Sequence, residues 1–377
     1  NGQRLMTSRF SSAMSLPPRA PRYILLRYLS VTLFVRVMIC CSVLVGLLEV
    51  LALLEQTTPI LQRHLGVQGL MLYVGLRLPF LLSNTLPFAV LIGALVMLTQ
   101  MTLASETAIL RAAGLSTLGF YLKLAPITLV LGFMGVMIDD QIAPRSELAL
   151  AIWWNRPDPT PENGHAFWFR DTSRIVHVGY AADGGARLGE VDIYTRDMEG
   201  RLTGTLHAAQ ASHTPAGGWI LHDVSGLSVH NLVAQAQPTQ ASVPWAMNLP
   251  PAEIIRLAAD RPPISTRLMI ERLLGHVPSN DTPAYLKAGL LERLMRPISL
   301  LVLLLIAMPV LYIPPRTGSR SWLPVWCLGS GLLFIVTQGL FRAMGNAGLL
   351  PPLMAVLPGL IIFTLGALSA LLRNETL

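Results

Sequence analysis

Residues 78–104 read LPFLLSNTLPFAVLIGALVMLTQMTLA, and no side chain in this stretch is charged. A helix needs about 20 mostly apolar residues to cross the hydrocarbon core of a bilayer, so this stretch is long enough to span it. Further apolar stretches with few charges occupy residues 29–54, 115–138, 297–315, 321–341 and 353–372. The sequence therefore predicts six membrane-spanning helices.

The overall composition agrees with a membrane protein. The chain has 377 residues, of which 52% are hydrophobic and only 13% charged, whereas soluble domains carry about 25% charged residues. Residues 139–296 hold 14 Lys and Arg against 17 Asp and Glu, and the rest of the chain holds 14 against 4. The excess base therefore flanks the apolar stretches. It forms no cationic patch on the polar segment, so a nucleic-acid partner is not expected.

The basic residues also predict the orientation of the chain. With the N-terminus inside, the cytoplasmic pieces hold ten Lys and Arg, and the two short external loops hold three, Arg63, Arg77 and Arg342. Cytoplasmic loops of membrane proteins carry the excess of Lys and Arg. Both termini are therefore expected in the cytoplasm, and the long segment between the third and fourth spans is expected outside.

This long segment has a different pattern from the spans. Apolar and polar residues alternate at 175–180, 191–195 and 218–224, and Gly-rich turns separate the runs. Short alternating runs of this kind indicate antiparallel β-structure, as a sandwich or an open barrel. The predicted fold is thus an α-helical membrane protein with six transmembrane helices and an inserted periplasmic all-β, jelly-roll-like domain.

The domain boundaries follow from these changes of pattern. After Pro250-Pro251 the alternation ends and the pattern turns helical again, and residues 264–274 have the pattern of a short amphipathic helix. The predicted parts are a disordered tail at 1–22, spans one to three at 23–140, the β domain at 141–262, a periplasmic connecting helix at 263–286 and spans four to six at 287–377.

No catalytic or metal-binding motif is evident. The chain lacks the signatures of a phosphate-binding loop, a zinc protease and the common serine hydrolases, so an enzyme is not predicted. Seven of the eight histidines lie in the long segment between the third and fourth spans, but none is paired at short ligand spacing, so no metal site is predicted. Asp139 and Asp140 fit acids at the outer interface better than a proton-shuttling pair.

The cytoplasmic turn between spans two and three, residues 105–114, is the most informative segment. Ser105 has the chemistry of an N-cap, and Glu106 suits the positive end of the helix dipole. Gly114 suits the position that ends a helix. A short capped helix here can dock into a cytoplasmic partner, or it can merely connect two spans, and spacing alone leaves both possibilities open.

Several short motifs, from just before this turn onward and in the same order along the chain, match the sequences of one known protein family. LPFAVLIGAL at 86–95, followed by Ser105-Glu106 and by RAAG at 111–114, resembles the YjgP/YjgQ permease family of lipopolysaccharide export. IAP at 142–144, FWF at 167–169 and GEVDIY at 189–194 match in the same order. The resemblance covers about residues 23–372 and is closer to the LptG branch of this family than to the LptF branch.

The resemblance implies a function and a set of partners. Such a chain is a permease subunit of an ABC transporter that extracts lipopolysaccharide from the inner membrane and passes it to a periplasmic bridge. The implied partners are an LptF-like permease, a dimeric LptB-like ATPase and an LptC-like subunit. ATP and Mg²⁺ would be used by the ATPase, and this chain would bind no cofactor. The turn would be the coupling helix, with Ser105, Glu106, Arg111 and Gly114 as its contact residues.

The resemblance also directs attention to the path of the lipid. Family members often carry lysines near the outer end of the first span, where this chain has Glu49 and Glu55. Recognition of the lipid's phosphates would then fall to Arg63, Arg145 and Arg156, or to the partner subunit. Because a charge at membrane depth is costly, Glu49 is expected to face the central cavity or a polar group of the neighbouring subunit.

The strand at 175–180 offers a second candidate for this path. Val176, Val178 and Tyr180 share one face of the strand, and an acyl chain in transit needs an apolar lining. The same pattern also fits a closed core. Two other functions stay open, namely the LptF-type subunit of the same transporter and a membrane scaffold whose β domain binds a partner without moving lipid.

Overall fold

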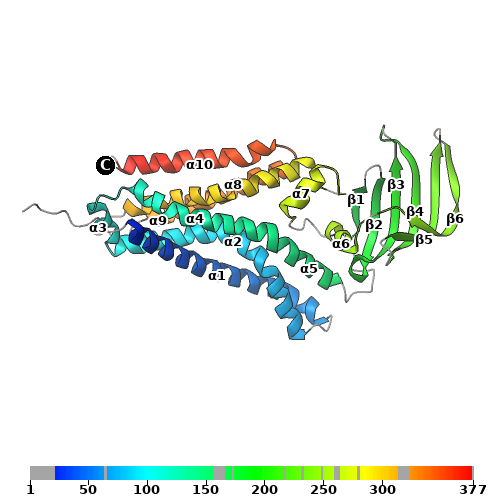
Figure 1. Ribbon diagram of the computed structural model, residues 1–377, viewed down its shortest axis with the longest axis horizontal. Coiled ribbons are helices and arrows are strands. Elements are labelled where there is room, and N and C mark those ends of the chain that lie inside the picture. The colour runs from blue at the N-terminus through cyan, green and yellow to red at the C-terminus, as the bar shows by residue number, and fades with distance from the viewer. Residues whose placement is uncertain are drawn as a thin grey trace, which may run out of the picture.

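Figure 1 shows the computed structural model as an elongated molecule, with a bundle of long helices on one side and a β-sheet on the other. The structure describes residues 22–62, 66–155, 166–171, 174–197, 199–214, 218–230, 233–247, 249–258, 264–277, 281–312 and 322–375. The predicted tail lies outside these ranges except for Arg22, which is already helical.

Among the described residues, six helices are long and apolar enough to cross a membrane. The first two, α1 (Arg22–Gln62) and α2 (Gly66–Leu103), pack against each other and extend beyond the predicted spans. A Cβ atom at Gly93 would lie 2.9 Å from the Cα atom of Val37. Glycine therefore allows the two helix backbones to approach closely, as is common between membrane helices.

The third span continues further than the sequence predicted. Helix α4 (Thr117–Met137) runs through a π-helical turn, η1 (Ile138–Ile142), into α5 (Ala143–Asn155). The predicted start of the β domain at residue 141 is therefore wrong, because the first strand begins at Phe167. The sequence of α5 contains three Ala and two Leu, which are strong helix formers and sustain the helix beyond the apolar stretch.

The second half of the bundle begins with α8 (Pro283–Ala307), which continues as the short 3₁₀ helix η4 (Met308–Tyr312). Two further spans follow, α9 (Leu323–Asn346) and α10 (Pro352–Glu375). Helix α8 begins four residues before the predicted boundary, because the Thr282 side chain accepts a hydrogen bond from the Tyr285 N–H and caps it. Helices α4 and α8 pack together, and a Cβ atom at Gly132 would lie 2.7 Å from the Cα atom of Pro297.

The β domain is one antiparallel sheet in which the strands follow one another in chain order. Its strands are β1 (Phe167–Asp171), β2 (Arg174–Ala182), β3 (Arg187–Arg196), β4 (Leu202–His213), β5 (Trp219–His230) and β6 (Val233–Trp245). A jelly roll has two sheets built from Greek keys. The described strands form a meander instead, because short connections pair each strand with its successor in sequence.

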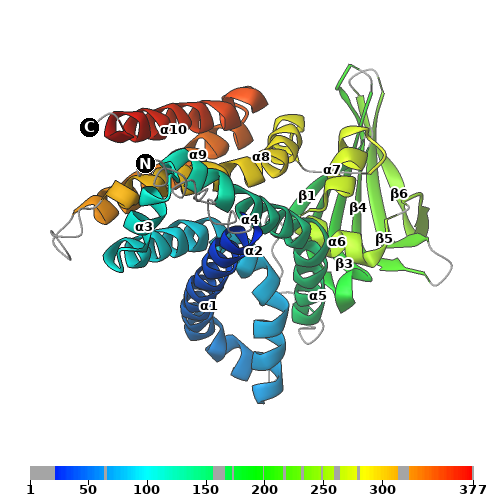
Figure 2. The same cartoon turned by 60° about the vertical axis from the view of Figure 1, so that its left-hand side comes forward.

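One face of the sheet forms the core of this domain. Val178 on β2 and Val191 on β3 are fully buried there, and helix α6 (Pro251–Ala258) covers them with Ile254 and Leu257. This helix falls inside the segment that was predicted to be β-structure. The segment 263–286, predicted as a connecting helix, contains the shorter helix α7 (Thr266–Leu273) and the start of α8. Figure 2 shows α6 and α7 between the bundle and the sheet.

Candidate functional site

An ion-pair cluster joins the helices at the end of the bundle nearest the sheet. Asp139 and Asp140 lie on η1 and face Arg293 and Arg296 on α8. Arg293 Nη1 is 2.8 Å from Asp140 Oδ1, its Nε is 3.4 Å from Asp139 Oδ2, and Arg296 Nη1 is 3.3 Å from the same Asp139 oxygen. The adjacent carboxylates are thus paired with two arginines one helical turn apart.

Local structure explains why both acids reach the same arginine. A π-helical turn inserts one extra residue and widens the backbone at that point, and such turns are frequent at functional sites. Arg293 also donates to Thr266 Oγ1, at 2.8 Å, and to the Ile264 carbonyl oxygen at the start of α7. Arg296 donates to Ser83 Oγ on α2, at 3.0 Å. The cluster therefore fixes α2, η1, α7 and α8 relative to one another.

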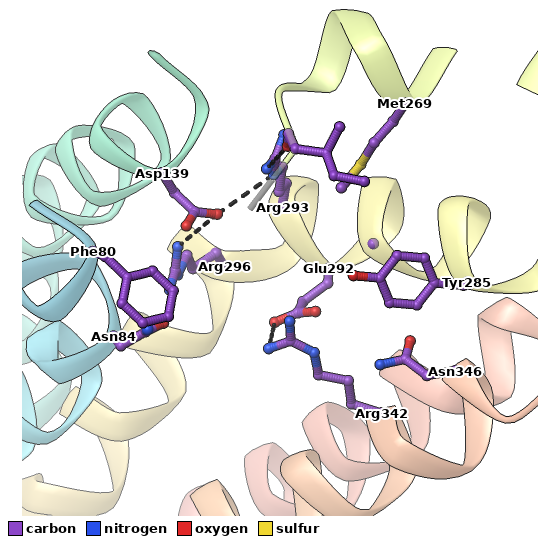
Figure 3. A pocket seen from close by; sticks show the side chains of 12 residues that line it. Phe80, Asn84, Asp139, Met269, Tyr285, Glu292, Arg293, Arg296, Arg342 and Asn346 are labelled. Carbon is purple, nitrogen blue, oxygen red and sulfur yellow. Dashed lines mark hydrogen bonds and ion pairs between the residues drawn. The ribbon is translucent and has the colours of Figure 1, made fainter. Parts of the chain in front are cut away.

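A polar cavity of about 360 Å³ opens beside this cluster (Figure 3). It is lined by Phe80, Asn84, Asp139, Ile264, Met269, Tyr285, Gly289, Glu292, Arg293, Arg296, Arg342 and Asn346. Glu292 Oε1 on α8 lies 2.8 Å from Arg342 Nη1 on α9, and this pair faces the cavity (Figure 3). The cavity is thus a junction of five helical elements with charged side chains of both signs.

The charges of this junction balance. Three arginines, Arg293, Arg296 and Arg342, meet three carboxylates, those of Asp139, Asp140 and Glu292. Charged groups within membrane helices are tolerated when they pair with one another or face water. This arrangement can hold the helices in a defined packing, and it can exchange its internal pairs for contacts with a polar ligand when the helices move.

The sequence reasoning missed most of this site. It placed Asp139 and Asp140 at the outer interface but assigned them no partners. Arg296 and Arg342 were read as residues that flank the spans. The available signal was the spacing of Glu292, Arg293 and Arg296, which put three charges within about one helical turn at the start of an apolar stretch.

Glu49 is buried inside this chain, with 7% of its surface exposed. Neither of its carboxylate oxygens has a hydrogen-bond partner among the described residues. Arg77 on α2 carries the positive charge that interacts electrostatically with Glu49. Arg77 also contacts the ring and the hydroxyl of Tyr73. Glu49 is therefore turned toward α2, and its place on the path of the lipid stays a prediction.

The other candidate residues for the lipid's path are spread over the molecule. Glu55 and Arg145 are exposed, on α1 and α5 respectively. Arg63 and Arg156 lie outside the described residues. Among the described residues, no three His, Cys, Asp or Glu side chains gather so that they could hold a metal ion.

At the opposite end of the bundle, residues 105–114 form the expected short helix, α3 (Glu106–Ala112). The predicted N-cap is wrong, because Ser105 has φ +59° and its side chain accepts no capping hydrogen bond. An N-cap needs an extended backbone. Here the chain reverses directly out of α2, and the Ser105 N–H donates to the Thr102 carbonyl oxygen at 3.1 Å.

Helix α3 is terminated by Gly114, where the sequence predicted its end. Gly114 has φ +87°, and its N–H donates to the Arg111 carbonyl oxygen at 2.8 Å. The Leu115 N–H donates to the Leu110 carbonyl oxygen at 3.0 Å. These two bonds define a Schellman motif, in which glycine supplies the left-handed residue.

Three side-chain contacts anchor α3 to the neighbouring helices. The Tyr28 hydroxyl on α1 donates to Glu106 Oε2 at 3.0 Å. The Arg111 guanidinium lies 4.3 Å from the ring centre of Tyr312 on η4 and donates to Thr117 Oγ1 at 3.3 Å. Ile109 is 67% exposed. The helix is thus held against the spans and still presents an exposed apolar side chain.

The strand residues share a face as predicted. Val176 and Val178 are fully buried in the core beneath α6, and Tyr180 is half-buried. A ligand reaches the two valines only when α6 moves away from the sheet. Their role in the lipid's path stays a prediction, and this structure shows them as core residues.

Comparison with known proteins assigns a chain of this architecture to a protein family. The model of the lipopolysaccharide export system permease family LptF/LptG matches residues 27–373. The chain belongs to the LptF/LptG permease family. The match includes all six apolar helices and the inserted sheet, so the resemblance seen in the sequence is confirmed over nearly the whole chain.

Individual LptF/LptG relatives are distant but cover the full length. The lipopolysaccharide export system permease protein LptG of Escherichia coli K12 is 23% identical over 362 residues, which is 94% of this chain and 99% of that protein. LptG of Haemophilus influenzae is 23% identical over 355 residues, 90% of this chain and 96% of that protein. The similarity to the LptG branch agrees with the sequence-based assignment.

Proposed function

We propose that the chain is the LptG-type permease subunit of an ABC transporter that extracts lipopolysaccharide from the inner membrane and passes it to a periplasmic bridge. The observation that carries this function is the family match across residues 27–373, which includes both groups of three apolar helices and the sheet between them. The family is one of permeases, so ATP hydrolysis belongs to a separate LptB-like ATPase with its own ATP and Mg²⁺.

The orientation of the chain follows from its charges and shape. Helix α3 and the end of α10 lie at the end of the bundle away from the sheet (Figure 1). The excess of Lys and Arg in the loops at that end supports a cytoplasmic location for both termini and for α3. The sheet then lies in the periplasm, where an LptC-like subunit and the bridge receive the lipid.

Helix α3 is the proposed docking element for the ATPase. Its exposed apolar residue Ile109 offers a contact for a cytoplasmic partner, and the bonds of Glu106 and Arg111 to the spans fix the helix in place. A docked helix that is rigidly held can transmit a movement of the ATPase to the spans. The second permease is LptF-like and completes the cavity into which lipopolysaccharide enters.

Reconstitution tests this function. The chain is co-purified with its LptF-like and LptB-like partners in mild detergent, placed in vesicles that contain lipopolysaccharide, and assayed for ATP-dependent release of the lipid to an acceptor protein. Ile109→Asp should reduce both ATPase binding and release. Leu349→Asp is the matched control, since Leu349 is 72% exposed at the other end of the bundle and should leave both unchanged.

The outcomes separate the competing functions. An intact complex that hydrolyses ATP but releases no lipid would identify a scaffold. Assembly of the chain with a second LptG-type permease, and not with an LptF-type one, would identify the paralogous subunit.

A further inference from the structure

The face of the sheet opposite α6 carries a continuous row of polar and aromatic side chains. Trp168, His177, Asp192, His207 and Ser225 are direct cross-strand partners on β1 to β5. Side chains alternate between the two faces of a strand, so this row lies on the face away from the buried valines. This face is open to solvent, since Trp168 is 47% exposed and the His207 side chain is 55% exposed.

A shallow hollow of about 480 Å³ lies on this open face. Its lining residues are Asp192, Tyr194, Thr205, Leu206, His207, Ser225, Gly226, Leu227, Ala236, Gln237 and Thr239. Pockets for small ligands measure about 300–1,000 Å³ and place a few polar groups among apolar ones. The hollow therefore has the size and the mixed lining of a small-ligand site.

The polar groups of the hollow suit neutral hydroxyl groups. None of the described residues that line it is Lys or Arg, so its chemistry does not favour a phosphate. On the open face it offers a carboxylate, an imidazole and four hydroxyls, which together donate and accept hydrogen bonds. His177 Nδ1 lies 3.3 Å from one oxygen of Asp192, and His207 Nδ1 lies 2.6 Å from the other. These contacts hold the carboxylate in a fixed orientation.

An aromatic surface lies beside these polar groups. The rings of Trp168 and Tyr194 are stacked with centres 5.9 Å apart and planes 24° apart, and Trp168 lies 4.5 Å from the His177 ring. Trp168 is nevertheless 47% exposed. A flat apolar surface next to hydrogen-bonding groups matches a pyranose, which has a face of C–H bonds and a rim of hydroxyls.

We propose that the open face of the sheet binds a saccharide. The sugar ring lies against Tyr194 and Trp168, and its hydroxyls bond to Asp192 and His207. The inference rests on the proposed function, because lipopolysaccharide is a lipid that carries sugars. It assigns the sugar portion, rather than the acyl chains or the phosphates, to this face.

Saturation-transfer NMR on the full-length chain tests the site. The chain is kept in a detergent without a sugar headgroup, and the probe is the saccharide obtained from lipopolysaccharide by removing its acyl chains and phosphates. Inorganic phosphate and octanoate serve as the two comparison probes. We expect transfer to the saccharide ring protons and none to the comparison probes.

Variants locate the binding. Tyr194→Ala and His207→Ala should weaken the affinity at least about tenfold, which is about 1.4 kcal/mol, and Tyr194→Phe should retain it. The matched control is His222→Ala. His222 pairs with Ser212 across strands β4 and β5, at 2.9 Å, but it does not line the hollow, so the affinity should be unchanged.

Three results would overturn the proposal: no transfer to any sugar proton, binding of phosphate or octanoate in place of the sugar, or an equal loss in the His222 variant. Vesicle transport separates this inference from the proposed function. Lipid release without saccharide binding contradicts the site alone, and saccharide binding without lipid release contradicts the function alone.

Discussion

Arg293 shows how much of the junction depends on one side chain. Its guanidinium bonds to both acids of η1, to Thr266 and to the Ile264 carbonyl oxygen, and only 10% of the side chain is exposed. A buried charge is stable only while its partners remain. The burial of the two carboxylates is therefore stable only with this arginine present, and the burial of the arginine is stable only with the carboxylates present.

Replacement of Arg293 by Ala should destabilise the bundle by about 3–5 kcal/mol, because it leaves two carboxylates with a missing partner at low exposure. Arg293→Lys should recover part of this loss, since it keeps the charge but not the fork of donors. Denaturant unfolding in detergent micelles measures both. Arg267→Ala is the control, because Arg267 forms an exposed pair with Glu271 and should change stability little. Equal losses in the two Ala variants would show that burial is irrelevant to this arginine.

Glu106 accepts a hydrogen bond from Tyr28 within the chain and is also a residue that we propose contacts the ATPase. We expect Glu106→Ala to reduce lipid-stimulated ATP hydrolysis in the assembled complex at least about tenfold, because a hydrogen bond to a charged group contributes about 1.5–3 kcal/mol. Tyr28→Phe removes only the internal bond and should reduce hydrolysis less. Equal reductions would mean that Glu106 anchors α3 and does not contact the ATPase.

The contacts at the two ends of helix α3 decide whether this helix can couple the chain to a partner. The helix is only seven residues long, so its own hydrogen bonds hold it weakly. Its position depends on the Schellman motif at Gly114 and on the contacts of Arg111 with η4 and α4. A change at the end of the helix should therefore alter coupling to the partner before it alters the stability of the spans.

Gly114→Ala places a side chain at φ +87°, which costs about 1 kcal/mol and distorts the end of α3. We expect a several-fold loss of lipid-stimulated ATP hydrolysis with an unchanged unfolding midpoint of the purified chain. Gly329→Ala lies within α9, where an added Cβ meets nothing within 4 Å, and it should leave hydrolysis unchanged. A lowered midpoint for Gly114→Ala would assign the glycine to the stability of the spans instead.

At the scale of the whole molecule, one continuous element connects the two functional ends. Helix α8 carries Arg293 and Arg296 near the sheet, and η4 continues it to Tyr312, which contacts Arg111 of α3. A shift of α3 can therefore reach the ion-pair junction through a single rigid segment. On the other side of the bundle, α1 leaves a row of apolar residues exposed, including Leu47 and Leu54.

The exposed face of α1 predicts where the second permease packs. Leu54 is 73% exposed and Ala52 is 5% exposed. In the reconstituted complex, Leu54→Cys should form a disulfide with a cysteine in the fifth span of the second permease, and Ala52→Cys should not. Locking this seam should stop lipid release while basal ATP hydrolysis continues. Normal release from a locked complex would show that lipopolysaccharide does not enter the cavity along α1.

The sequence alone determined the features that depend on local pattern. Six apolar stretches, the alternation at 175–180 and the glycine at 114 are each visible within one segment, because spanning length, strand period and left-handed backbone are properties of neighbouring residues. Helix α5 was missed, because its mixed composition has neither the length of a span nor the alternation of a strand.

The tertiary structure decided which distant segments meet. Asp140 and Arg293 are 153 residues apart, and no local pattern says that η1 faces α8. The meander order of the sheet and the row from Trp168 to Ser225 likewise depend on the registers of five strands. The backbone of Ser105 is set by the reversal from α2 into α3, which overrides the preference of serine for an N-cap. Pairing, register and reversal are properties of the packed chain, because each is fixed by side chains that become neighbours only when it folds.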